Sequence, residues 1–158
     1  MIELKTSVAL AASLQLGAIL GGAGEGNQQH LYEFGKNLGI AFQVQDDYLD
    51  AFGDPDKFGK QVGGDILANK KTFLSIHAME VVTAAQLKEL TALNKGNEIA
   101  KVEKVLEIYK AADADAWAKQ LKEKYYKKAM DHLEEIAVLS ARKKPLMELA
   151  EYLINREH

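Results

Sequence analysis

The chain has 158 residues, of which 47% are hydrophobic and 27% charged, with a formal net charge of -3 at pH 7. This is the composition of an ordinary globular domain, and its charge gives no general reason to expect binding to nucleic acid. The absence of cysteine excludes disulfides, thiolate zinc sites and cysteine nucleophiles, and it is compatible with the reducing cytoplasm in which we expect the protein to act.

Two helices are expected in the first third of the chain. A helix over residues 3–20 is predicted from apolar residues that recur at helical spacing, namely Leu4, Val8, Ala11, Ala12 and Ile19. A glycine-rich turn follows it. A longer second helix is predicted over residues 28–52, where Gly53 and Pro55 end it.

The first helix is not expected to cross a membrane. Its most apolar stretch, residues 8–22, is shorter than the roughly 20 residues that a transmembrane helix needs. Glu3 and Lys5 precede this stretch without a basic leader, so we expect no secretory signal either. A buried helix of a bundle remains the interpretation.

Residues 53–69 are expected to form a loop. It is long for a connection inside a compact helical domain, which makes it a candidate functional segment. Helix resumes near Lys71, and the predicted inner face consists of Phe73, Leu74, Ala78 and Val81. Thr83 and Gln86 have the spacing of a capping box, which predicts a further helix that ends near Leu93 and is stopped by Asn94 to Gly96.

The rest of the chain is expected to be helical too. One apolar stripe comprises Ile99, Val102, Leu106 and Tyr109. A long helix after Asp113 is marked by Trp117, Leu121, Leu133, Ile136 and Ala137. Both sets of residues are predicted to lie in the core. Pro145 fits the first turn of a last helix, whose buried side would comprise Leu146, Leu149, Ala150 and Leu153. With no repeat and no linker, the fold prediction is a single all-α domain over residues 1–158, arranged as an antiparallel helical array.

The most informative stretch is FQVQDDYLD, residues 42–50. On a helix, Asp46 and Asp50 share one face about 5–6 Å apart, where two carboxylates repel each other unless a cation lies between them. Hard oxygen ligands favour Mg²⁺, with Mn²⁺ possible, and Mg²⁺ is usually completed by waters and substrate phosphates. An EF-hand does not fit, because its ligands alternate along a loop. A solvated acidic turn is the alternative.

Lysines downstream of this turn could neutralise phosphate oxygens. Lys60 and the pair Lys70 and Lys71 belong to the same glycine-rich segment and can fold back toward the carboxylates. Near the start of the chain, Lys5 and Thr6 offer another cation and a hydroxyl. Ordinary solvation at the surface is the alternative for each lysine.

These motifs resemble those of a known family. FQVQDDYLD, then GK and GGDILANKKT, resembles the second aspartate-rich region of the trans-isoprenyl diphosphate synthases, the polyprenyl synthetase family, in its farnesyl and geranylgeranyl diphosphate synthase group. ELKTS resembles the Lys-Thr segment that precedes that region. The resemblance covers roughly residues 2–74. It implies a bundle of the isoprenoid synthase type, of which this chain is the carboxyl-terminal portion, incomplete at the amino-terminal side.

The resemblance also implies roles for individual residues. The magnesium ligands would be Asp46 and Asp50, with Asp47 supporting the same cluster. The residues that contact the allylic diphosphate would be Lys5, Lys60 and Lys70. Thr6 and Gln43 match positions beside the reacting allylic carbon, where oxygen dipoles stabilise positive charge.

The implied reaction is the head-to-tail condensation of isopentenyl diphosphate with an allylic diphosphate in isoprenoid biosynthesis, by a transferase that we expect to be of farnesyl type. Metal ions assist departure of the diphosphate, and the isopentenyl double bond attacks the resulting cation. The family's earlier aspartate motif and paired arginines are absent from this sequence, so we expect the chain alone to be inactive. We also expect a homodimer or higher homo-oligomer, because surfaces meant for further helices would be exposed.

The sequence also bears on three other functions. A terpene cyclase is disfavoured because the companion motif of that group is absent, whereas a non-catalytic helical interaction or regulatory subunit remains an alternative. The basic runs 119–128 and 142–144 are interpreted as solvated helix faces rather than a nucleic-acid surface. The histidines lack the spacing of metal ligands; they are His30, His77, His132 and His158.

Overall fold

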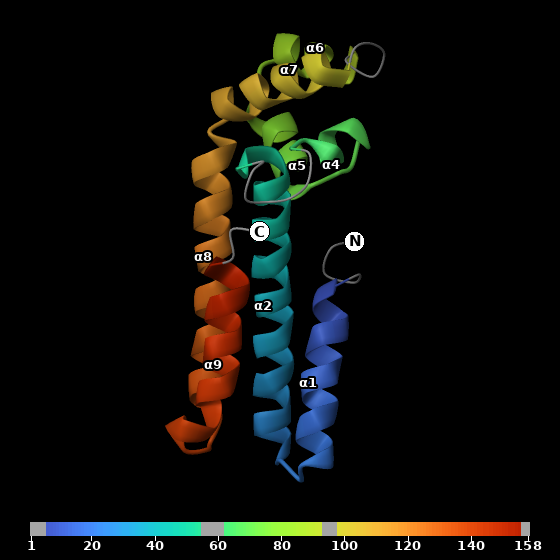
Figure 1. Ribbon diagram of the computed structural model, residues 1–158. Coiled ribbons are helices and arrows are strands. Elements are labelled where there is room, and N and C mark those ends of the chain that lie inside the picture. The colour runs from blue at the N-terminus through green and yellow to red at the C-terminus, as the bar shows by residue number, and fades with distance from the viewer. Residues whose placement is uncertain (1–5, 55–61, 93–97, 156–158) are drawn as a thin grey trace. The chain divides into compact units, whose positions relative to one another are not determined.

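The computed structural model describes residues 6–54, 62–92 and 98–155. The regular structure within these ranges is helical, which confirms the all-α prediction (Figure 1). In chain order the helices are α1 (Val8–Leu20), α2 (Glu25–Phe52), α4 (Gly64–Leu67), α5 (Phe73–Val81), α6 (Ala84–Ala92), α7 (Glu98–Ala111), α8 (Ala114–Glu135) and α9 (Ser140–Asn155). They fall into two compact units, the first built from the residues up to 43 and from 121 onward, the second from residues 44–120.

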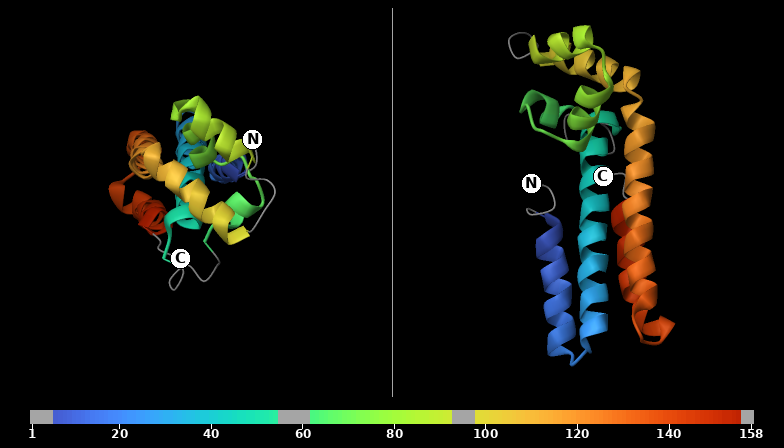
Figure 2. Two further views of the ribbon diagram at one scale, coloured as in Figure 1. Left: turned by 90° about the horizontal axis from the view of Figure 1, so that it is seen from above. Right: turned by 180° about the vertical axis from the view of Figure 1, so that it is seen from behind.

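The first unit consists of α1, most of α2, the second part of α8, and α9. These segments lie side by side in views from the front and from behind (Figures 1 and 2). Their apolar faces meet in one core, made of Phe34, Leu38, Ala41, Ala129, Leu133, Ile136, Ala150 and Ile154. Leu10 and Leu14 of α1 pack against it. The helix periodicity of the sequence therefore produces a bundle core.

A tight turn joins α1 to α2. The chain leaves α1 through Gly22, which has a φ of 72°, a conformation that glycine adopts without steric cost. The Ala23 N–H donates to the Ala18 oxygen at 2.9 Å and the Gly22 N–H to the Ile19 oxygen at 3.0 Å, which is the Schellman pattern. The glycine-rich turn was predicted from the sequence, and α2 begins three residues before its predicted start.

Glycines allow α1 and α2 to approach closely. A Cβ atom added to Gly35 would lie 2.9 Å from the Ala11 Cα, and one added to Gly39 would lie 2.7 Å from the Ser7 Cα. Real Cβ atoms do not come this close to backbone, so larger side chains would push the two helices apart.

Polar contacts tie the end of α8 to its neighbours. The buried Lys143 ammonium donates to the Glu134 carbonyl at the end of α8, where a cation is favourable. The interpretation of residues 142–144 as a solvated face is therefore wrong for Lys143. His30 and His132 face each other across α2 and α8 with their Nδ1 atoms 3.3 Å apart, a pairing that a separation of 102 residues could not reveal.

The last helix differs from its predicted start. Because α9 already begins at Ser140, Pro145 lies inside the helix and not in its first turn. Proline cannot donate to the carbonyl four residues earlier, which belongs to Ala141. Ala141 is an exposed residue, so water can satisfy that oxygen. The helix therefore tolerates a proline that the sequence rules place at its beginning.

The second unit contains the end of α2, then α4 to α7 and the start of α8. Within the predicted loop 53–69 the structure has a one-turn helix, α4. The capping box is confirmed, since the Thr83 N–H donates to Gln86 Oε1 at 3.0 Å and the Gln86 N–H to Thr83 Oγ1 at 3.3 Å. The predicted first turn of residues 3–5 and the stop at residues 94–96 lie outside the described residues.

Several predicted core positions are buried, namely Ala11, Leu74, Ala78, Tyr109, Leu133, Ile136 and Ala150. Others are exposed, contrary to prediction: Ala12, Ile19, Val81, Ile99, Ala137 and Leu149. Helical spacing identifies the apolar side of a helix, but a position at the edge of that side is buried only where a neighbour reaches it. Ile136 and Ala137 also follow α8 rather than belong to it.

Within the described residues, no helix is both long and apolar enough to span a lipid bilayer.

The glycine contact between α1 and α2 predicts opposite effects for two alanine substitutions. Gly35→Ala should lower the free energy of unfolding by about 1–3 kcal/mol, because the new methyl group meets Ala11. Gly17→Ala is the matched control, since nothing lies within 4 Å of its added Cβ. It should raise stability by up to about 1 kcal/mol through helix propensity. Urea denaturation of both variants measures the difference, and equal effects would contradict the close approach.

Candidate functional site

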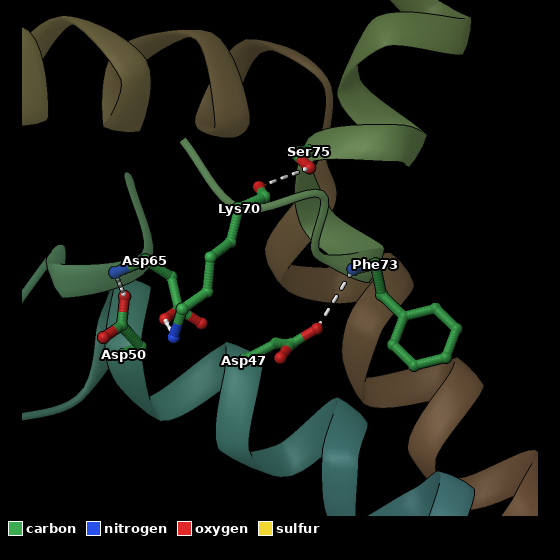
Figure 3. Close-up of polar contacts among 6 residues, drawn as sticks. All are labelled: Asp47, Asp50, Asp65, Lys70, Phe73 and Ser75. Atoms are coloured by element: carbon green, nitrogen blue, oxygen red, sulfur yellow. Dashed lines mark hydrogen bonds and ion pairs between the residues drawn. The ribbon is translucent and has the colours of Figure 1, made fainter. Parts of the chain in front are cut away.

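The aspartate cluster lies on the last two turns of α2, within the second unit. The structure confirms that this stretch is helical, so Asp46 and Asp50 are one turn apart. Both are half-buried, whereas Asp47 is only 4% exposed. The three carboxylates therefore have different surroundings, which Figure 3 shows for Asp47 and Asp50.

Asp50 organises the segment that follows the loop. Its Oδ2 accepts the Asp65 N–H at 2.9 Å (Figure 3). Its backbone oxygen accepts the Gly63 N–H at 2.7 Å. Gly63 has a φ of 87°, which favours glycine at this position. Two hydrogen bonds thus hold the start of α4 against the acidic turn.

Lys70 is brought to the cluster by the way α4 ends. Asn69 has a φ of 52°, the Lys70 N–H donates to the Asp65 oxygen at 3.0 Å, and the Asn69 N–H donates to the Ile66 oxygen at 3.1 Å. This is a Schellman motif with asparagine in the left-handed position. It turns Lys70 back so that its ammonium pairs with the Asp65 carboxylate.

Negative charge accumulates around Asp50. Burial raises the pKa of Asp50, and the nearby carboxylates of Asp65 and Asp46 raise it further, while the Asp65 N–H and the Lys70 ammonium lower it. The pKa of Lys70 is raised mainly by its hydrogen bond to Asp65, with smaller contributions from Asp50 and Asp46. Among the described residues, these contacts bring Lys70 to three carboxylates, and a further cation would be electrostatically favourable there.

Asp47 serves the start of α5. Its Oδ2 accepts the Phe73 N–H at 3.0 Å, and Thr72 Oγ1 accepts the Ser75 N–H at 3.2 Å as the cap of the helix. A carboxylate at a helix amino terminus is electrostatically favourable. Next to it, burial raises the pKa of Tyr109 to about 12. Asp47 therefore helps to hold the beginning of α5 by accepting its first N–H, a role that the sequence alone did not reveal.

The other predicted site residues are less informative. Lys5 and Lys60 lie outside the described residues. Thr6 precedes α1 and Gln43 belongs to α2, both half-buried in the first unit. In the described parts of the chain, no three histidine, aspartate or glutamate side chains converge closely enough to hold a metal ion.

Asp65 is the residue to which sequence reasoning gave no role. It contributes an N–H to Asp50 and a carboxylate to Lys70, and only 15% of its side chain is exposed. The available signal was its position directly after Gly63 and Gly64 and five residues before Lys70. Without knowing that α4 forms there, this spacing has no geometric meaning.

Comparison with known proteins decides the family. Residues 1–112 match the family described as polyprenyl synthetase. The chain belongs to this family. The matched residues of this polyprenyl synthetase chain include every site residue predicted from the sequence, and they extend to the end of α7.

Relatives match nearly the whole chain. A geranylgeranyl diphosphate synthase of Sulfolobus acidocaldarius is 38% identical over 99% of this chain and 48% of its own length. Heptaprenyl diphosphate synthase component 2 of Geobacillus stearothermophilus is 34% identical over 99% of this chain and 48% of its own. The crystal structure of a geranylgeranyl pyrophosphate synthetase from Pyrococcus horikoshii Ot3 has a TM-score of 0.90 at 30% identity, covering 99% of this chain and 47% of that one. The chain thus spans about half the length of its curated relatives.

The raised pKa of Asp50 predicts that removing its charge stabilises the protein. Below the ordinary value of 3.8, Asp50 is protonated in both the folded and the unfolded state. As the pH rises past that value, the carboxyl ionises first in the unfolded state, so stability is lost until the folded group has ionised too. Asp50→Asn should therefore raise the free energy of unfolding at neutral pH, by no more than about 1 kcal/mol for a half-exposed group.

Urea denaturation in EDTA at neutral pH and below pH 3.8 measures this difference. The gain should disappear at the lower pH, where the wild-type carboxyl is protonated. Asp131→Asn, at an exposed position of α8, is the control for the loss of one negative charge and should leave the free energy of unfolding at neutral pH nearly unchanged. A loss of stability at neutral pH in Asp50→Asn would contradict the electrostatic account.

Proposed function

We propose that this chain contributes the metal-dependent diphosphate site of a prenyl diphosphate synthase, an enzyme that condenses isopentenyl diphosphate with an allylic diphosphate. One observation carries the proposal: the Asp50 carboxylate lies among Asp46, Asp65 and Lys70, with its pKa raised. A cation and a diphosphate together would satisfy this arrangement, since the cation offsets the carboxylates and the phosphate oxygens accept from the lysine.

The residues fit magnesium. Asp46 and Asp50 offer hard oxygen donors one turn apart, and Mg²⁺ needs only one or two carboxylates when phosphate and water complete its shell. The lack of a three-residue ligand cluster among the described residues is compatible with such a site. Bound magnesium would supply charge stabilisation to a departing diphosphate. Mn²⁺ has similar ligand preferences.

The remaining site residues are proposed from the family resemblance. Lys70 contacts the diphosphate after leaving Asp65, together with Lys5 and Lys60. Thr6 and Gln43 lie beside the reacting allylic carbon. Asp47 supports the cluster through the segment it holds, because it accepts the first N–H of α5, and α5 begins three residues after Lys70.

The product length is not fixed by these residues. A farnesyl-type product stays a prediction from the resemblance. The relatives are named for geranylgeranyl, geranylfarnesyl and heptaprenyl products. The described site residues therefore do not predict the product length.

Self-association is proposed from an exposed apolar surface. Leu16, Ile19 and Leu20 of α1 are all exposed. Water disfavours adjacent exposed apolar side chains, which mark surfaces that other protein segments cover. We propose that another chain covers this part of α1, in a homodimer or a higher homo-oligomer.

Magnesium-dependent binding of pyrophosphate tests the proposed site. Calorimetry should detect binding to the wild-type chain with Mg²⁺ and none in EDTA. Asp46→Ala should weaken binding by at least about tenfold. Removing a residue that only hydrogen-bonds to a metal ligand already costs about that much, and removing the ligand itself should cost no less. Asp131→Ala is the matched control. It removes an aspartate of α8 that is not part of the cluster on α2, and it should bind as the wild type does.

Absence of magnesium-dependent binding in the wild type would refute the proposed site. The result would favour the alternative, a non-catalytic helical subunit whose acidic turn is merely solvated.

The isolated 158-residue chain should not catalyse the condensation, because the family's first aspartate motif and paired arginines are absent from its sequence. Incubation with Mg²⁺, labelled isopentenyl diphosphate and dimethylallyl diphosphate should give no prenyl product. Circular dichroism confirms that the sample is folded and helical. Turnover by the purified chain would overturn this prediction and show that the second cluster suffices.

A further inference from the structure

We propose that α7 braces the segment that carries Asp65 and Lys70, and that Lys101 is a positioning residue for the diphosphate site. The inference rests on the proposed function and extends it to a helix outside the aspartate cluster and its glycine-rich segment. It is drawn from contacts at both ends of α4, all within the second unit.

The first contact is at the beginning of α4. Gly63 lies directly before the helix, and a Cβ added there would be 2.7 Å from Val102 Cγ1 and 2.9 Å from Val102 Cγ2. The valine side chain is therefore packed against the backbone of Gly63. The Gly63 N–H also donates to the backbone oxygen of Asp50. This glycine is therefore held between α7 on one side and the acidic turn on the other.

The second contact is at the end of α4. The Lys101 ammonium donates to Asn69 Oδ1 at 2.7 Å and to the Leu67 oxygen at 3.4 Å. A carbonyl at a helix carboxyl terminus lacks an intrahelical partner, and a cation there is favourable. Lys101 thus contacts the residue in the left-handed turn whose conformation directs Lys70 toward Asp65.

These contacts fix both functional residues at once. Asp65 lies between Gly63 and Asn69, and Lys70 directly follows Asn69. A four-residue helix has too few hydrogen bonds to be stable alone, so its position depends on what holds its ends. Adjacent residues of α7 hold both ends, through the packing of Val102 and the hydrogen bonds of Lys101.

An ordinary surface lysine would not make these contacts. Lys104, one turn further along α7, is such a lysine: it forms ion pairs with Glu89 at 3.3 Å and Glu107 at 3.0 Å. The two lysines therefore provide a matched comparison on one helix. Lys101 donates to residues of the segment that carries Asp65 and Lys70, whereas the ion pairs of Lys104 are with Glu89 and Glu107.

The test compares Lys101→Met, which keeps an apolar stem and loses the ammonium, with Lys101→Arg and Lys104→Met. Magnesium-dependent pyrophosphate binding by calorimetry is the first measurement. Hydrogen exchange of the backbone amides of residues 63–70, without ligand, is the second. Lys101→Met should weaken binding about tenfold, the lower end of the loss seen when an outer partner of a ligand is removed. It should also speed exchange at Asp65 and Lys70.

Lys101→Arg should recover most of both properties, because arginine can donate to the same oxygens. Lys104→Met should behave as the wild type. The proposal is overturned if Lys101→Met binds and exchanges as the wild type does, or if exchange rises equally in α9, which would indicate general unfolding. If the wild type binds no pyrophosphate, the proposed function fails, and exchange alone decides whether Lys101 holds the segment.

Discussion

The partly buried negative charge of Asp50 at the end of α2 is the constraint on which the rest of the site depends. Asp50 is half-buried beside Asp46 and Asp65, and its pKa is raised mainly by loss of contact with water. An isolated helix would avoid this arrangement. Here part of the cost is offset because the Asp65 N–H donates to the Asp50 carboxylate. The remaining negative charge is available to a cation.

The acidic turn also organises the chain around it. Asp50 receives the start of α4, Asp47 receives the start of α5, and Lys70 lies between these helices in sequence. Two neighbouring turns of one helix therefore hold the beginnings of both α4 and α5. The fold of the second unit and the charge of its site arise from the same carboxylates.

Most of the helices could be predicted from the sequence. Periodic apolar residues, the glycines after α1 and the Thr83 capping box located elements well, because these signals are local. The sequence did not reveal α4, since four residues carry no periodicity, nor the exposure of Ile19 and Leu149, which depends on distant neighbours.

The site divides in the same way. The pairing of Asp46 with Asp50 follows from helix geometry and was accessible from their spacing. The roles of Asp65 and Lys101 were not, because each depends on a contact with a segment distant in sequence. The buried position of Asp47 also depends on tertiary structure, since it exists only when α5 docks on α2.

The left-handed conformation of Asn69 has an evolutionary consequence. Glycine would occupy this position with even less strain, and aspartate would also be tolerated. Glycine, however, would remove the oxygen to which Lys101 donates, whereas aspartate would convert that hydrogen bond into an ion pair. The residue at position 69 should therefore vary together with the one at position 101. In homologues with glycine at position 69, a lysine at position 101 would no longer be favoured by this hydrogen bond.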